Sequence, residues 1–89
     1  METAEISSHL LRVFTTLRDE QGWITAQALS AKAEVARRTA RAHLARLVKL
    51  GLADVAEVYP GHRYRLSPMA EKRNKGMLER LKAAEEVFA

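Results

Sequence analysis

The stretch Val35–Leu52, VARRTARAHLARLVKLGL, sets the interpretation of the whole chain. No acidic residue interrupts its basic residues, which are Arg37, Arg38, Arg41, Arg46 and Lys49. Its apolar residues recur with the period of an α-helix, at Ala40, Leu44, Leu47 and Val48. Gly51 follows the last basic turn, where glycine often ends a helix in the left-handed conformation. The pattern predicts a helix with one face in a core and guanidinium groups on the other.

The basic charge of this 89-residue chain is concentrated in its centre. The formal net charge is +4 and the sequence pI is about 9.9. Residues 35–70 carry seven Lys or Arg side chains but two carboxylates, Asp54 and Glu57, whereas the rest of the chain is close to neutral. A basic excess confined to one segment is more typical of a surface that binds a polyanion than of a general aid to solubility.

Length and composition favour a single domain over residues 1–89, because so short a chain cannot enclose two cores. There is no cysteine, which excludes disulfides, thiolate metal centres and a cysteine nucleophile. No apolar run approaches the ~18 residues of a membrane span, and the N-terminus does not resemble a signal peptide. We therefore expect a cytoplasmic protein with no membrane partner. Because a small core without disulfide bonds is only marginally stable, we also expect a homodimer.

The segments before the central stretch predict two helices joined by a short strand. Residues 3–21 form an amphipathic helical pattern with apolar residues at Ile6, Leu10, Val13, Phe14 and Leu17. Trp23–Thr25 is a brief β-prone run, and the Thr25 hydroxyl is suited to cap the helix that follows. That helix is expected over residues 26–33, with Ala28 and Leu29 buried, and residues 34–36 then form a tight turn.

The segments after Gly51 predict a hairpin. Residues 53–59 are β-prone, Pro60-Gly61 is a strong turn signal, and residues 62–66 alternate. Tyr64 and Leu66 would face the core, with Arg63 and Arg65 on the outer face.

A last helix is predicted from Met69 towards Phe88, because Ser67-Pro68 is a typical helix start. Its apolar seam alternates spacings of four and three residues, as in a coiled coil. We assign the seam mainly to a partner subunit; the alternative is that it folds back on the first helix of the same chain. The predicted dimerisation residues are Met77, Leu78, Leu81, Ala84 and Phe88.

This order of elements resembles the winged helix-turn-helix domain of bacterial transcription regulators of the MarR, ArsR and PadR types. The segments RRTARAHLARLVKLGLA and HRYRLSP carry the resemblance, and the positions that match the family pattern are Thr39, Ala40, Leu44, Leu47, Gly51 and Leu52. It implies a mainly α fold with a small β-hairpin, in the order α-β-α-α-β-β-α. The helix-turn-helix would span residues 25–51, the wing hairpin 53–66 and the C-terminal dimerisation helix 68–88.

The chain departs from that family pattern at two positions. Glu34 stands where a glycine is common in the turn, and a left-handed conformation there costs a residue other than glycine about 1 kcal/mol. Ala36 stands where a serine often caps the recognition helix, and the loss of a cap costs about 1 kcal/mol.

The resemblance implies a nucleoid-associated, homodimeric transcriptional regulator, most simply a repressor, that binds a palindromic operator in double-stranded DNA. Arg38 and Arg41 are the candidates for base contacts, since an arginine fork can meet guanine O6 and N7 together. Ala42 would lie against a thymine methyl group. The residues expected at phosphates are Arg37, Thr39, Arg46 and Lys49, and those expected on the wing are Arg63 and Arg65.

The sequence contains no pattern typical of an enzyme, a cofactor site or a metal site. The three histidines are far apart in the sequence and have no cluster of acidic ligands beside them. No small-molecule effector can be identified. Three alternatives stay open: a DNA-binding accessory factor in plasmid or phage replication, partition or excision; a winged helix adaptor that binds another protein; and an RNA or general nucleic-acid binder without sequence preference. A basic recognition face favours DNA over the adaptor.

Overall fold

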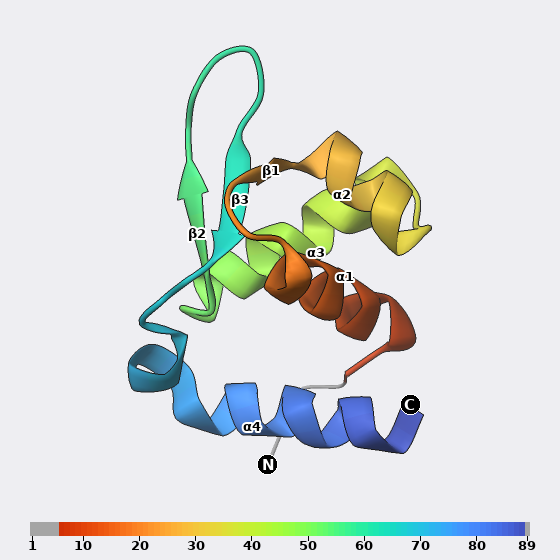
Figure 1. Ribbon diagram of the computed structural model, residues 1–89, viewed down its shortest axis with the longest axis vertical. Coiled ribbons are helices and arrows are strands. Elements are labelled where there is room, and N and C mark those ends of the chain that lie inside the picture. Colours follow the sequence, from red (N-terminus) through yellow and green to blue (C-terminus); the bar gives the residue numbers. More distant parts are fainter. Residues whose placement is uncertain (1–5, 89) are drawn as a thin grey trace.

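The computed structural model describes residues 6–88 and contains four helices and a three-stranded sheet (Figure 1). The elements are α1 (Ser8–Asp19), β1 (Ile24–Thr25), α2 (Ala26–Ala33), α3 (Arg37–Lys49), β2 (Ala53–Ala56), β3 (Arg63–Leu66) and α4 (Ala70–Phe88). The predicted element order and the winged helix-turn-helix fold are confirmed. The β2–β3 hairpin and α4 lie at opposite ends of the molecule, with α1, α2 and α3 between them.

Helix α1 is shorter than its apolar pattern predicts. It begins after Ser7, whose Oγ accepts a hydrogen bond from the backbone N–H of Leu10 at 3.1 Å, and it ends at Asp19 because Glu20 is already extended. The predicted start at Thr3 lies outside the described residues, but Ile6 and Ser7 precede the helix. The side chains it buries are Leu10, Leu11, Val13, Phe14 and Leu17.

Helix α2 has the predicted bounds and the predicted cap. The Thr25 Oγ1 accepts a hydrogen bond from the backbone N–H of Ala28 at 3.1 Å. The expectation that Ala28 is buried is wrong, because the inward face of α2 carries Leu29, Ser30 and Ala33. The small Ser30 is accommodated in the core because its hydroxyl donates to the Gln27 carbonyl oxygen at 2.7 Å.

The end of α3 follows from Gly51, as the sequence predicts. Gly51 has φ +83°, its N–H donates to the Val48 carbonyl oxygen, and the Leu52 N–H donates to the Leu47 carbonyl oxygen. This pair of bonds is the Schellman motif, which satisfies the last carbonyls of a helix. It also turns the chain sharply so that Leu52 and Ala53, both buried, enter the core at the start of β2.

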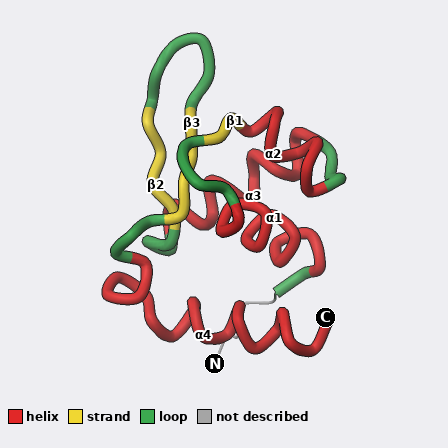
Figure 2. The backbone as a smooth tube through the Cα atoms, in the orientation of Figure 1, coloured by secondary structure: helices red, strands yellow, loops and turns green. Residues whose placement is uncertain are grey.

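The sheet has the strand order β1-β3-β2, with both pairs antiparallel. Tyr64 in the central strand pairs with Ile24 on one side and Val55 on the other. Tyr64 and Leu66 pack partly buried against the core, as their alternation predicts. The paired part of the hairpin is shorter than expected, because residues 57–62 form a loop that extends away from the body (Figure 2).

Helix α4 is not one continuous helix, because Asn74 has the non-helical angles φ −156° and ψ 70°. The Asn74 Oδ1 accepts a hydrogen bond from the Met77 N–H at 3.2 Å, so Asn74 acts as the N-cap of the long second part. The short first part starts at Ala70, and the Ser67 Oγ in the turn before it accepts a hydrogen bond from the Met69 N–H at 3.0 Å.

The assignment of the α4 seam to a partner subunit is wrong for Met77, Leu78 and Leu81. All three are buried within this chain's own core, with Leu81 fully inaccessible. Ala84 packs partly buried against the same core, and the side chain of Phe88 lies outside the described residues. Since α4 packs on α1, the seam completes the monomer's core.

An ion pair fixes the far end of α4 on α1. The Arg18 Nη1 and Nη2 donate to the Glu85 Oε1 and Oε2 at 2.5 and 2.9 Å. The hydrogen bonds from Arg18 hold the pKa of Glu85 below its ordinary value. Over residues 6–88, none of the helices is long and apolar enough to cross a membrane.

Candidate nucleic-acid interface

Helix α3 presents a basic outer face and an apolar inner face, as its sequence predicts. Ala40, Leu44 and Leu47 are fully buried. The exposed residues of the helix are Arg37, Arg38, Arg41, Ala42, Ala45 and Lys49. Thr39 and Arg46 are half-buried at the flanks of this face. Two alanines at the centre of the outer face keep the helix narrow, so that another surface can approach its backbone closely.

Within the part of the chain that the structure describes, no carboxylate pairs with the basic residues of this face. Among residues 6–88, the ion pairs engage Arg18, Lys32, Arg65 and Arg73, and none of them involves a basic residue of α3 or Arg63. Uncompensated guanidinium groups on a rigid helix are an electrostatic footprint typical of a polyanion-binding surface.

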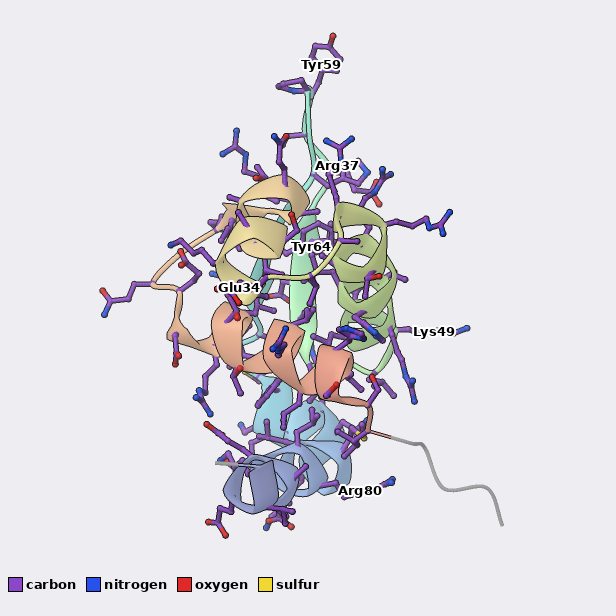
Figure 3. The ribbon with its side chains drawn as sticks, turned by 90° about the vertical axis from the view of Figure 1, so that its right-hand side faces the viewer. Glu34, Arg37, Lys49, Tyr59, Tyr64 and Arg80 are labelled. Atoms are coloured by element: carbon purple, nitrogen blue, oxygen red, sulfur yellow. The ribbon has the colours of Figure 1, made fainter. Side chains whose placement is uncertain are left out.

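A hollow of about 580 Å³ brings α3 and the hairpin together. Arg37 and Arg41 contribute from α3, Arg63 from β3, and Pro60 and Gly61 from the hairpin loop. None of the described residues that line it carries a carboxylate. Figure 3 shows Arg37 at the end of α3 nearest the hairpin tip and Lys49 farther along the same helix, towards α4. Three of the predicted site residues, Arg37, Arg41 and Arg63, therefore line the same hollow.

The N-terminal end of α2 lines the same hollow, through Thr25, Ala26 and Gln27. The sequence interpretation did not include these residues in the site. The Thr25 cap marks the start of α2, where the first backbone N–H groups of a helix are free to bind an anion. The sequence alone does not indicate that this end of α2 lies beside Arg37 and Arg41, so the cap did not assign these residues to the site.

The turn between α2 and α3 sets the angle at which α3 is presented. Glu34 adopts the left-handed conformation, with φ 57° and ψ 47°, at the position where the family pattern commonly has glycine. The Arg12 Nη1 of α1 donates to the Glu34 carbonyl oxygen at 3.3 Å. Ala36 begins α3 without a side-chain cap. Both sequence departures are therefore present in the structure, and Arg12 supports the strained turn from α1.

The two predicted wing arginines have different surroundings. Arg63 is exposed and lines the hollow. Arg65 is half-exposed: its Nε donates to the Asp54 Oδ2 at 3.1 Å, and its guanidinium carbon lies 4.6 Å from the centre of the Trp23 ring. Asp54 also accepts from Arg73 Nη1 at 3.2 Å. Arg65 thus joins the sheet to the Trp23 side chain and to the beginning of α4, away from the hollow.

His43 is the titratable group of α3 whose protonation is perturbed. Burial lowers the pKa of His43, and the charges of His9 and Arg46 lower it further. The structure therefore brings His9 near His43, although they are distant in sequence. Within residues 6–88, no group of three or more His, Asp or Glu side chains could hold a metal ion.

No protein-family model and no curated protein sequence matches this chain. Solved structures do resemble it. A candidate DNA-binding protein from Ralstonia eutropha has a TM-score of 0.65 at 20% identity, over 82% of this chain and 98% of its own. A MarR-family transcriptional regulator from Silicibacter pomeroyi has a TM-score of 0.65 at 18% identity, over 93% of this chain and 57% of its own.

BpsR from Bordetella bronchiseptica, whose DNA binding is regulated by 6-hydroxynicotinic acid, has a TM-score of 0.66 at 18% identity, over 94% of this chain and 67% of its own. The chain spans little more than half the length of the Silicibacter regulator. The fold of this chain is therefore the winged helix-turn-helix fold of MarR-family transcription regulators.

Proposed function

We propose that this protein is a sequence-specific DNA-binding transcriptional regulator. The observation that carries the proposal is the basic face of α3, which lies beside Arg63 of the wing around one hollow and has no carboxylate partner among residues 6–88. The major groove of B-DNA is about 12 Å wide and admits one α-helix. A narrow helix with arginines along its outer face is suited to that groove.

In this proposal α3 lies in the major groove and the wing lies on the backbone or minor groove. Arg38 and Arg41 read bases and Ala42 contacts a thymine methyl group, because these three residues are exposed on the outer face. The phosphate contacts fall to Arg37, Thr39, Arg46, Lys49 and Arg63. Arg65 has a supporting role, since its hydrogen bond to Asp54 and the position of its guanidinium over the Trp23 ring hold it in place.

We further propose that the protein acts as a homodimeric repressor on a palindromic operator in the cytoplasm. A two-fold dimer sets two recognition helices about 34 Å apart, one turn of the DNA helix. The dimer contact must use surface other than Met77, Leu78 and Leu81, because these side chains fill the monomer's core. Sedimentation tests the oligomeric state: we expect a mass twice the 10.0 kDa of the chain.

Selection of bound fragments from random duplex DNA, followed by affinity measurements over a range of salt concentrations, tests DNA binding. Each neutralised phosphate steepens the log–log slope by about 0.9. Several phosphate contacts therefore predict a steep slope, whereas a protein-interaction adaptor predicts almost none. Recovery of many unrelated sequences with equal affinity would instead indicate a general nucleic-acid binder.

Two substitutions separate base contact from phosphate contact. Arg41→Ala is expected to relax the sequence preference at one base position, while Lys49→Ala is expected to weaken binding to all sequences and to reduce the salt slope by about 1. Lys82→Ala is the matched control, because Lys82 is exposed on α4 at the other end of the molecule. If both α3 variants bound the selected duplex like the control, the assignment of this face would be wrong.

A further inference from the structure

The long second part of α4 carries charged residues on the face that points away from α1. Its other face is buried in the core through Met77, Leu78 and Leu81, at the end of the molecule opposite the hairpin (Figure 1). Four charged residues of the outer face are exposed, namely Lys75, Glu79, Lys82 and Glu86. Among residues 6–88, the ion pairs include none of these four side chains. Their charges are therefore available to a partner.

These four residues form a charge stripe along one side of the helix. Their spacings are four, three and four residues, which keep side chains together on an α-helix. Their signs alternate, from Lys75 at the start to Glu86 at the end. Read from the other end of the helix, the stripe has the same spacings and the opposite sign at every position. It is therefore complementary to a second stripe that runs antiparallel to it.

The stripe selects another copy of this chain as its partner, in one orientation. An antiparallel copy places its Glu86 opposite Lys75 and its Lys82 opposite Glu79. Two-fold symmetry repeats both contacts, so that every lysine of the stripe meets a glutamate. A parallel copy would place like charges together, which is unfavourable.

Small and apolar side chains lie on the same outer face. Ala83 is exposed there, and Val87, one turn further on, is 78% exposed. A small residue lets two helices approach closely, and covering Val87 removes apolar surface from water. One helix face is still a small interface, so the contact depends on salt and is strengthened when DNA holds both copies together.

The antiparallel arrangement presents both recognition helices to the same side of a dimer. Figure 3 looks along α4, with α1 above it and Lys49 of α3 projecting sideways. Two antiparallel helices stacked face to face are related by a two-fold axis that crosses both of them, along the sideways direction of Figure 3. Rotation about this axis leaves the sideways direction unchanged. The α3 faces of the two copies therefore point the same way, as a palindromic duplex requires.

We propose that the outer face of α4 is the contact surface of the homodimer. In it two copies lie antiparallel, and the charged side chains of each stripe pair with those of the other. This inference rests on the proposed function, for which it names the surface that joins the two copies. It uses the face of α4 that the monomer's core leaves uncovered.

Two doubly substituted variants test the stripe by sedimentation. Lys75→Glu with Lys82→Glu makes the stripe wholly acidic, whereas Glu79→Lys with Glu86→Lys makes it wholly basic. At low salt the wild type is expected to be a dimer, and each variant alone a monomer of 10.0 kDa. An equimolar mixture of the two variants should form a heterodimer, because an acidic stripe then faces a basic one. Added salt should dissociate both dimers.

The matched control is Glu71→Lys with Lys72→Glu, which exchanges two exposed charges on the short first part of α4, outside the stripe. It should dimerise like the wild type. All the substituted residues are exposed, and circular dichroism checks that each variant keeps its helices. Exposed ion pairs contribute little, so Lys82→Ala, the control for the α3 variants, is expected to weaken the dimer by about tenfold or less.

DNA binding gives a second measurement. On the selected palindromic duplex, each charge-reversed variant alone should lose the cooperative binding of two copies, and the mixture should recover it. A single half-site should still be bound by each variant, because α3 is untouched.

The outcomes separate the two proposals. If the charge-reversed variants sediment like the wild type, both alone and mixed, the α4 interface is wrong and the DNA-binding function stands. If the wild type selects no duplex and shows no salt-dependent binding, the DNA-binding function is wrong. Sedimentation of the mixture still decides the interface in that case, since it needs no DNA.

Discussion

Asn74 joins the end of the recognition helix to the beginning of the long part of α4. Its Nδ2 donates to the Leu50 carbonyl oxygen at 3.0 Å, while its Oδ1 accepts from the Met77 N–H at 3.2 Å. One side chain therefore satisfies a free carbonyl at the end of α3 and a free N–H at the start of the next helical segment. This single amide therefore links the end of α3 directly to α4.

Asn74→Ala is expected to lower the free energy of unfolding by about 2 kcal/mol, because it removes an N-cap and leaves the Leu50 carbonyl without its partner. Urea unfolding followed by circular dichroism measures the change. Asn74→Asp separates the two bonds, since a carboxylate can cap Met77 but cannot donate to Leu50. We expect Asn74→Asp to be intermediate, and equal stability of Asn74→Ala and the wild type would contradict this role.

Gly51 and Gly76 should respond to alanine in opposite directions. Gly51 has φ +83°, and a Cβ there would lie 3.1 Å from the Arg73 Cβ. Gly51→Ala is therefore expected to cost about 1–2 kcal/mol of stability. Gly76 lies in a helix, and a Cβ there would meet no heavy atom within 4 Å outside its neighbours and its own helical backbone. Gly76→Ala is therefore expected to stabilise by about 0.5–1 kcal/mol. Thermal unfolding of both variants tests this prediction. A change of the same sign in the melting temperature of both variants would refute it.

The fold was predictable from the sequence because its strongest signals are local. The period of Ala40, Leu44 and Leu47 and the position of Gly51 determine α3 and its end, and Thr25 determines the start of α2. Pro60-Gly61 between two β-prone runs predicts the hairpin. Each of these signals acts within a few residues along the chain, so no tertiary contact was needed to interpret it.

The errors come from contacts between residues that are distant in sequence. The amphipathic pattern of α4 is the same whether its apolar seam packs on a second subunit or on α1. Whether the seam packs on α1 depends on how much of the α1 surface the other helices leave uncovered, which the sequence of α4 does not encode. Asn74 lies four residues after Ala70 and three before Met77, at a heptad position, yet its backbone is non-helical and its side chain bonds to Leu50. For the same reason, the sequence did not indicate that Asp54, opposite Arg65 in the neighbouring strand, and the Trp23 ring contact the Arg65 side chain.

Glu34→Gly is expected to stabilise the protein by about 0.5–1 kcal/mol. Glu34 has φ 57°, which strains a residue with a Cβ, and its backbone contacts with Ser30 and Arg12 do not require its side chain. The gain is reduced by the greater freedom of glycine in the unfolded chain. Urea unfolding measures it, with Ala31→Gly as a matched control, since this exposed helical position should lose about 1 kcal/mol. A loss of stability in Glu34→Gly would show that its side chain contributes more than the strain costs.

His43 is expected to make the protein less stable in mild acid. Burial, with the charges of His9 and Arg46, lowers the pKa of His43 below its ordinary value of 6.5 in the folded state. The unfolded chain therefore takes up a proton at a higher pH than the folded chain, and protonation favours unfolding. The contribution of His43 to stability is complete above about pH 6.5 and declines as the pH falls towards the folded pKa.

His43→Gln removes this proton uptake, so its free energy of unfolding should change less between pH 7.5 and pH 5 than that of the wild type. Urea unfolding at a series of pH values gives the slope of unfolding free energy against pH for each protein. The difference in unfolding free energy between the wild type and His43→Gln at pH 7.5 serves as the control, because it reports packing alone. Identical slopes for the two proteins would show that the His43 imidazole is equally easy to protonate in both states.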